Sequence, residues 1–187
     1  RTAGETQNQV VVLKRGVNDI YGSSGEIDTQ SVITIDGLAV GSSGAFFLNA
    51  DSNIVISYQQ LGGQYGYQIF NSNDGQPGDF VEFNDVSEKI ITGCFDVLGD
   101  MYFLTEGNEI VIVDPDDKQQ IIDGPFTLTE TSHRQQSILK PLPSGGILLV
   151  NNNGKAVIVT REGFTTESVD TTTNSALLVN ECAVFQE

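Results

Sequence analysis

The sequence predicts an all-β protein, and three observations support that fold class. Valine, isoleucine, threonine, phenylalanine and tyrosine dominate the apolar runs, as β-strands prefer. No stretch keeps apolar residues at the i, i+3, i+4, i+7 spacing of an amphipathic helix. The third and strongest observation is an internal repeat. We therefore expect strands throughout and no long helix.

The repeat is a pair of apolar runs joined by a polar connector rich in Asn, Asp, Glu or Gly. It occurs at 45–57, 101–113 and 147–159. In each copy the last residue of the first run lies six positions before the first residue of the second, as Leu104 does before Ile110. Such runs predict three β-hairpins. Their apolar residues are consecutive rather than alternating, which predicts strands buried on both faces.

A fourth copy begins near the C-terminus, with Leu177–Asn180 and then Cys182–Phe185, but the second half of its hairpin is missing. Gln9–Leu13 resembles that missing strand, and Asp19–Tyr21 would follow it as an outer strand. Closing a radial array of sheets pairs strand edges that would otherwise stay open. We therefore predict that Val10–Leu13 pairs with Cys182–Phe185 and joins the two ends of the chain.

The equivalent positions Leu48, Leu104, Val150 and Phe185 are 56, 46 and 35 residues apart. An average of about 45 residues matches a four-stranded blade. Nearly the whole chain thus resembles β-propeller repeat proteins, in architecture only. The resemblance implies a small propeller of about four blades. Its single domain, 1–187, would have the closing blade's outer strands at 9–28 and its inner strands at 170–187, and three blades at 30–85, 86–125 and 126–169.

Composition excludes several classes of protein. With 39% hydrophobic and 18% charged residues, the chain is too apolar to be intrinsically disordered. The net charge of −16 repels phosphate groups, so we expect no binding to nucleic acid or to anionic membrane surfaces. No apolar run approaches the roughly 20 residues of a membrane helix, so we expect no membrane insertion. The two cysteines, Cys94 and Cys182, are expected as free thiols rather than a bridge. Localisation stays open, and an extracellular, surface or virion setting is favoured.

Polar connectors suggest a ligand-binding face. The connectors between second and third strands would share one face of a propeller with the links between blades. That face would present amides and carboxylates to sugar hydroxyls, a cation or a basic protein loop. The candidate ligand-binding residues are Asn49, Asp51, Asn53, Glu106, Asn108, Asn151, Asn152 and Asn153. The tyrosines around the glycine-rich segment 61–66 are candidate partner contacts: Tyr58, Tyr65 and Tyr67.

Metal and catalytic signals are weaker. We expect no cofactor, with calcium the one cation that the oxygen-rich connectors would suit. The metal candidates are Asp114, Asp116 and Asp117, although Asp and Asn are also what turns prefer. His133, the single histidine, has no nucleophile elbow to serve. Asp36 and Asp96 are a candidate acid pair for glycoside hydrolysis, at positions that are not equivalent in the repeat.

No motif defines a specific activity, so function rests on the repeat and on the missing catalytic signatures. We expect a non-enzymatic protein-interaction or structural assembly module on a propeller scaffold, with a protein or glycan partner and an open oligomeric state. One alternative is a carbohydrate-binding lectin, calcium-assisted or not. The other is a carbohydrate-active hydrolase. Fold alone does not choose among them.

Overall fold

The structure is a computed structural model. It describes residues 8–15, 27–35, 39, 44–118, 120–124, 138–150 and 156–165. These residues form fourteen β-strands and contain no helix, which confirms the all-β prediction. Within the same ranges there is consequently no helix that could cross a lipid bilayer.

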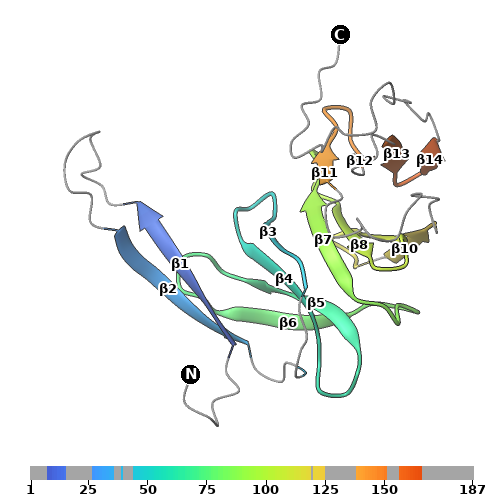
Figure 1. The fold of residues 1–187 in the computed structure, drawn as a ribbon. Helices are drawn as coiled ribbons and strands as arrows, with labels where there is room; N and C mark the ends of the chain where they lie inside the picture. Colours follow the sequence, from blue (N-terminus) through green and yellow to red (C-terminus); the bar gives the residue numbers. More distant parts are fainter. Residues whose placement is uncertain are drawn as a thin grey trace, which may run out of the picture.

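The strands form one hairpin and three four-stranded antiparallel sheets (Figure 1). The N-terminal hairpin pairs β1 (Asn8–Arg15) with β2 (Ile27–Ile35). The first sheet contains β3 (Phe46–Leu48), β4 (Ile54–Gln59), β5 (Tyr65–Phe70) and β6 (Pro77–Glu82). The second contains β7 (Ile90–Phe95), β8 (Met101–Thr105), β9 (Ile110–Val113) and β10 (Gln120–Asp123). The third contains β11 (Ile138–Pro141), β12 (Ile147–Val150), β13 (Ala156–Thr160) and β14 (Gly163–Thr165).

All three predicted hairpins are present. Leu48 pairs with Ile54, Leu104 with Ile110, and Val150 with Ala156, which are the pairs that the six-residue spacing predicts. The expectation of strands buried on both faces also holds in the second sheet, where every residue of β8 and β9 is buried. Each sheet is a simple up-and-down meander, because its strands pair in chain order.

The first hairpin lies at a different position in the strand order of its sheet than we expected; this position is called its rank below. The second and third hairpins supply the second and third strands of their sheets, β8–β9 and β12–β13. The hairpin at 45–57 instead supplies the first and second strands, β3 and β4. The connector Asn49–Asn53 therefore joins first and second strands, so its structural counterpart is the β7–β8 turn and not the β8–β9 turn.

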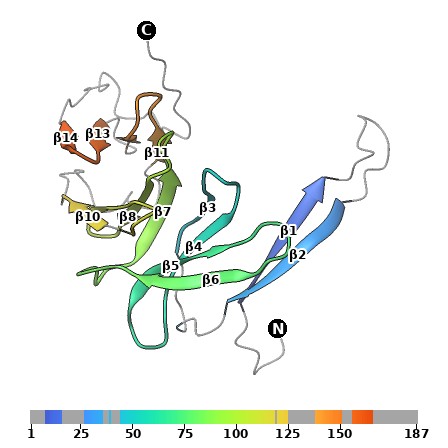
Figure 2. The ribbon, with the colours of Figure 1, turned by 180° about the vertical axis from the view of Figure 1, so that it is seen from behind.

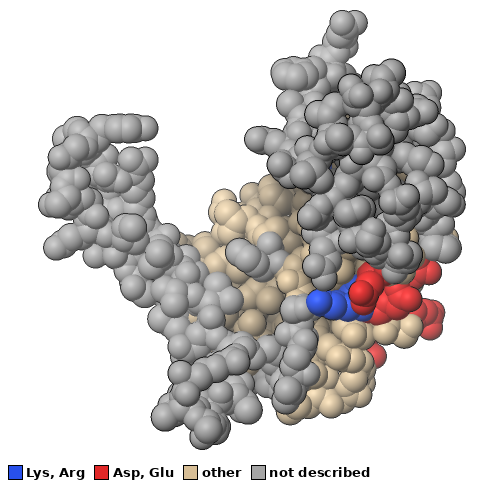
Figure 3. Space-filling view, viewed as in Figure 1, with Lys and Arg blue, Asp and Glu red and all other residues tan. Residues whose placement is uncertain are grey.

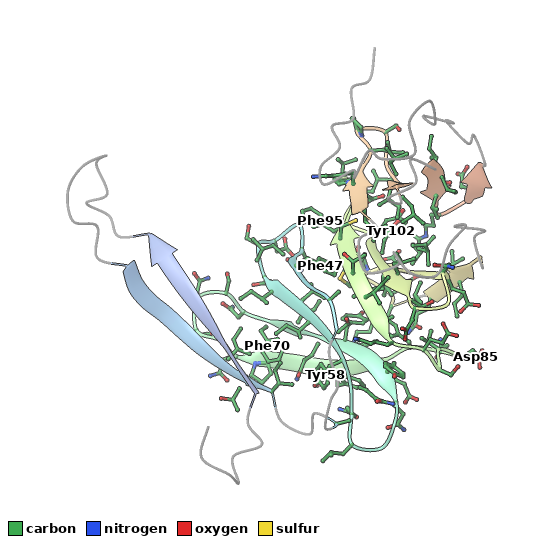
Figure 4. The ribbon with its side chains drawn as sticks, viewed as in Figure 1. Phe47, Tyr58, Phe70, Asp85, Phe95 and Tyr102 are labelled. Atoms are coloured by element: carbon green, nitrogen blue, oxygen red, sulfur yellow. The ribbon has the colours of Figure 1, made fainter. Side chains whose placement is uncertain are left out.

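Successive sheets pack face to face through three apolar clusters (Figure 2). Between the first and second sheets, the Phe103 ring stacks on Tyr67, with 5.4 Å between centroids, and meets Phe47 and Phe83. Figure 4 shows Phe47 between β3 and β7. The strand β7 contacts both β3 and β11, so the first strands of the three sheets are neighbours. The second sheet is thus covered on both faces.

The two ends of this array are the N-terminal hairpin and the third sheet. Ile33 and Ile35 of β2 pack on the first sheet, against residues that include Tyr58 and Phe70 (Figure 4). Val10–Leu13 does form a strand, but its partner among the described residues is β2. Cys182–Phe185 and Asp19–Tyr21 lie outside the described residues. The described sheets form an open array and not a closed ring.

One turn recurs at five hairpins, at 49–53, 60–64, 96–100, 105–109 and 142–146. The first and fifth residues of each turn are joined by a backbone hydrogen bond, and the fourth donates to the carbonyl of the first. The fourth residue always has a positive φ, and Gly99 and Gly145 occupy that position at 97° and 93°. This geometry is a three-residue loop with a left-handed fourth position, which favours glycine or asparagine.

Candidate functional site

The candidate site is a pocket of about 480 Å³ between the second and third sheets. Four turns form its walls: β7–β8, β9–β10, β11–β12 and β13–β14. Acidic residues dominate the charged lining, with one arginine among them: Asp96, Asp100, Asp114, Asp116, Arg161 and Glu162. Leu98, Pro115 and Tyr102 add apolar surface. The pocket is therefore an anionic cavity with an apolar wall.

Asp96 joins the two sheets at the base of this pocket. It is almost fully buried, at 1% exposure. Its Oδ1 accepts hydrogen bonds from the backbone N–H groups of Leu98 and Asp100, which fixes the β7–β8 turn. Its Oδ2 accepts from the Tyr102 hydroxyl at 3.2 Å and from the Gly146 N–H, across the sheet boundary, at 2.7 Å. All of these donors compensate the burial of a carboxylate.

Arg161 makes the second link between the sheets. From the β13–β14 turn its guanidinium donates to Asp114 in the β9–β10 turn at 2.6 Å, and its other nitrogen lies 3.6 Å from Asp100. A hydrogen bond from the Asp116 N–H, with the Arg161 bond next, lowers the pKa of Asp114. Burial raises the pKa of Asp100, and Arg161 opposes that rise. The surroundings thus lower the pKa of one pocket carboxyl, Asp114, and raise that of another, Asp100.

Two neighbouring groups complete the electrostatics. Burial raises the pKa of the Tyr102 hydroxyl, and the nearby Asp96 charge raises it further. Cys94 carries a free thiol whose pKa burial raises to about 12. Neither group is ionised near neutral pH, so neither is activated as a nucleophile. Cys182 lies outside the described residues.

In the structure, the connectors of the predicted ligand-binding face lie beside different parts of the chain. Glu106 donates its N–H to the Lys89 carbonyl, so the β8–β9 turn lies against the link that joins the first and second sheets. Figure 3 shows acidic side chains beside basic ones in this region, and Figure 4 marks Asp85 at the link's outer end. In contrast, Asn53 accepts from the Ser72 N–H, which places the β3–β4 turn beside the β5–β6 turn. Asn151, Asn152 and Asn153 lie outside the described residues.

Two candidates of the connector face have clear local roles. Asn49 Oδ1 accepts from the N–H groups of Asp51 and Asn53 and so holds its own turn together. Asn108, 8% exposed, occupies the left-handed position of the β8–β9 turn at a φ of 68°. Its Oδ1 is buried and has no hydrogen-bond partner among the described residues. Turn geometry therefore accounts for the residue types that suggested a ligand.

The tyrosines proposed as partner contacts lie mainly in the core. Tyr58 and Tyr67 are 3% and 2% exposed, and Tyr65 is half-buried. Tyr67 packs between the first and second sheets, and Tyr58 packs on the opposite face of the first sheet. Tyr58 and Tyr67 are therefore core residues of the described structure, and a partner contact through these tyrosines stays a prediction. The segment 61–66 is a hairpin turn running into β5, not a projecting insertion.

The metal candidates belong to the β9–β10 turn. Asp114 Oδ1 accepts from the Asp116 N–H, and its Oδ2 is bound by Arg161. Asp114 and Asp116 line the pocket, and Asp117 follows them in the same turn. In the part of the chain that the structure describes, no three acidic, histidine or cysteine side chains are grouped to hold a metal ion.

Of the candidate hydrolase pair and the histidine, the structure describes only Asp96. Asp96 serves the sheet boundary, as described above, whereas Asp36 and His133 lie outside the described residues. The residues that sequence reasoning missed are Arg161, Glu162 and Leu98. Arg161–Glu162 forms an ordinary polar turn in the sequence. Only its position opposite Asp114 in the folded chain reveals a role.

The sequence matches no protein-family model and no curated protein. The proposed function therefore rests on the pocket and on the array of sheets.

Proposed function

We propose that the chain is a non-enzymatic protein-interaction module built on a small β-propeller of about four blades. The observation that carries this function is the use of three of the pocket's five carboxylates in contacts within the protein. Asp96 is fully engaged in hydrogen bonds that join two sheets, and Arg161 is committed to Asp100 and Asp114. Side chains held in this way stabilise a binding surface and are not available as a general acid or base.

The array of sheets supports the propeller part of the proposal. Three consecutive meanders pack face to face, with their first strands adjacent. On the third sheet, Leu148 pairs with Ile158 on the face opposite to the one that packs on the second sheet. In the second sheet the corresponding residues, Tyr102 and Ile112, pack against the next sheet. A closing sheet made of the N-terminal hairpin and the C-terminal strands would cover this last face.

Ring closure can be tested with the native Cys182. Val11→Cys and Val12→Cys, which lie on opposite faces of β1, would each be made with Cys94→Ser so that Cys182 is the single native thiol. We expect one of the two variants to form a disulfide within a monomer under mild oxidation. Peptide mapping of the unreduced protein detects it. Bridges only between chains, or none in either variant, would contradict closure.

The interaction function needs a separate experiment. The purified chain would be used as bait in an extract of its source, beside a glycan array with and without chelator and a panel of glycosides. We expect a protein partner retained in fixed proportion to the folded chain, and no retention by the chain after heat unfolding. Binding on the glycan array would support the lectin instead, and glycoside turnover would support the hydrolase.

A further inference from the structure

The tip of the β7–β8 turn differs from the other turns of its type. At the second and third positions, the five turns carry Ala-Asp, Leu-Gly, Val-Leu, Glu-Gly and Pro-Ser in chain order. Only the β7–β8 turn has two branched aliphatic residues at its tip, Val97 and Leu98. They are 58% and 75% exposed. The turn geometry does not require them, since the same backbone forms with polar residues elsewhere in the chain.

Leu98 also lies at the mouth of the pocket. It lines the cavity, and a side chain at Gly145 would meet the Leu98 Cδ1 at 2.8 Å, so Leu98 leans over the β11–β12 turn. Pro115, from the β9–β10 turn, adds a second apolar residue to the lining of the pocket. Large apolar side chains left in water beside a concavity are typical of a surface that a partner covers.

The charged part of the mouth determines what that partner must be. Arg161 is already paired with Asp100 and Asp114. Asp116 and Glu162 are exposed residues of the lining, from the β9–β10 and β13–β14 turns. The whole chain carries a net charge of −16. An anionic partner, including a second copy of this acidic chain, is disfavoured by that field.

We propose that Val97, Leu98, Pro115, Asp116 and Glu162 form a docking surface for a basic, amphipathic segment of a partner protein. Its lysine or arginine would direct the aliphatic stem along Leu98 and Pro115 and the cationic head toward Asp116 and Glu162. A neighbouring apolar side chain of the segment would cover Val97. This inference rests on the proposed interaction function and adds the place and the chemistry of the partner.

The test uses short fluorescent peptides with the full chain. One peptide alternates lysine and leucine, the second alternates lysine and serine, and the third alternates glutamate and leucine. Binding is followed by fluorescence anisotropy and by stopped flow, at low and at physiological ionic strength. The variants are Leu98→Ser, the double variant Asp116→Asn with Glu162→Gln, and the matched control Leu61→Ser. Leu61 is a leucine of similar exposure, at 73%, on a different turn.

We expect the lysine–leucine peptide to bind most tightly of the three. Leu98→Ser should weaken it about tenfold, mainly through faster dissociation, as loss of an apolar anchor does. The double charge variant should slow association and flatten the salt dependence, because rim charges act on encounter. Leu61→Ser should leave binding unchanged. All substituted residues are exposed, and thermal unfolding confirms that each variant is folded.

Three results would overturn the docking surface. The first is no binding of the lysine–leucine peptide. The second is equal binding of the lysine–serine peptide, or equal losses in Leu98→Ser and Leu61→Ser, which would show attraction by net charge alone. The third is binding of calcium alone, lost in the double charge variant, with no binding of the peptide. A partner retained equally by wild type and Leu98→Ser would leave the interaction function standing and remove only this surface.

Discussion

The first and second sheets contain the same sequence motif and use it differently. In both, two apolar runs form a hairpin whose register follows from the six-residue spacing. In the second sheet this hairpin lies in the interior as β8–β9, whereas in the first it lies at one side as β3–β4. The motif therefore determines local pairing. The rank of the hairpin within its sheet depends on which other strands the chain adds before and after it.

The difference arises in the interval between the hairpins. Among the described residues, three strands, β5, β6 and β7, lie between the first and second hairpins, and two, β10 and β11, lie between the second and third. The first interval is also the longer one, 56 residues against 46 from Leu48 to Leu104 to Val150. In the described residues the longer interval contains one more strand, and the first hairpin lies at the start of its sheet. Equal motifs with unequal spacing do not guarantee equal positions.

Equivalent leucines should show the largest consequence of this difference. Leu104 is fully buried, whereas its motif counterpart Leu48 is 52% exposed. Leu104→Ala should lower the free energy of unfolding by about 2–5 kcal/mol, because it leaves a cavity in the core. Leu48→Ala should change it by no more than about 0.5 kcal/mol. Urea denaturation of the two variants measures both values, and similar losses would contradict the different ranks.

The structurally equivalent turns give the next largest effect. Asn49 and Asp96 both accept two N–H groups of their own turn, but Asp96 also accepts from Tyr102 and Gly146. Asp96→Ala removes all four of these bonds, and the two that Asn49 does not make, from Tyr102 and Gly146, leave buried donors unpaired at a cost of about 1–3 kcal/mol each. Asn49→Ala should cost only about 1 kcal/mol. Thermal unfolding of both variants tests this order, and a larger loss in Asn49→Ala would argue against the Asp96 link.

The smallest effect concerns the charges between the second and third sheets. The lowered pKa of Asp114 contributes stability above the ordinary value of 3.8, and that contribution is lost as the pH falls through the lowered value. Asp100 contributes to stability with the opposite sign. Its pKa is raised, so its ionisation, as the pH rises through the raised value, opposes folding.

Arg161→Gln should raise the pKa of both carboxyls, because Arg161 lowers both. The stability that ionised Asp114 contributes is then lost at a higher pH when the solution is acidified. Carboxyl NMR titration gives the two values directly. Lys118→Gln, a change of an exposed base in the same β9–β10 turn, serves as control and should leave them unchanged. An unchanged pKa of Asp114 in Arg161→Gln would refute the ion pair between Arg161 and Asp114.

Much of the local structure follows from the sequence, because a hairpin needs only neighbouring residues. The all-β class, the three hairpins and the buried strands β8 and β9 could be predicted from apolar runs and polar connectors. The strand β6 could not, since Pro77–Glu82 begins with Pro-Gly, which is tolerated at the start of an edge strand but does not predict one. Contacts between sheets are equally hidden: Gly93 permits the close approach of Phe47, which no local pattern indicates.

The candidate site shows the same contrast between local structure, which the sequence predicts, and contacts between sheets, which it does not. Asp96, Asp114 and Asp116 stand out in the sequence as acidic residues in turns, but their assignments as hydrolase or metal residues do not describe their contacts. Their partners, Gly146 and Arg161, come from a different sheet. Such a pairing depends on how sheets stack, and periodicity within one sheet carries no information about stacking.

Amide hydrogen exchange of β3 and β8 tests the central claim most directly, namely that matching hairpins occupy different ranks. The β8 amides of Tyr102 and Leu104 face β7, which pairs them through Cys94 and Thr92. Their counterparts Phe46 and Leu48 face away from β4, on a strand that is terminal in its sheet among the described residues. We predict slow exchange at Tyr102 and Leu104 and fast exchange at Phe46 and Leu48. Equal protection of both pairs would contradict the account.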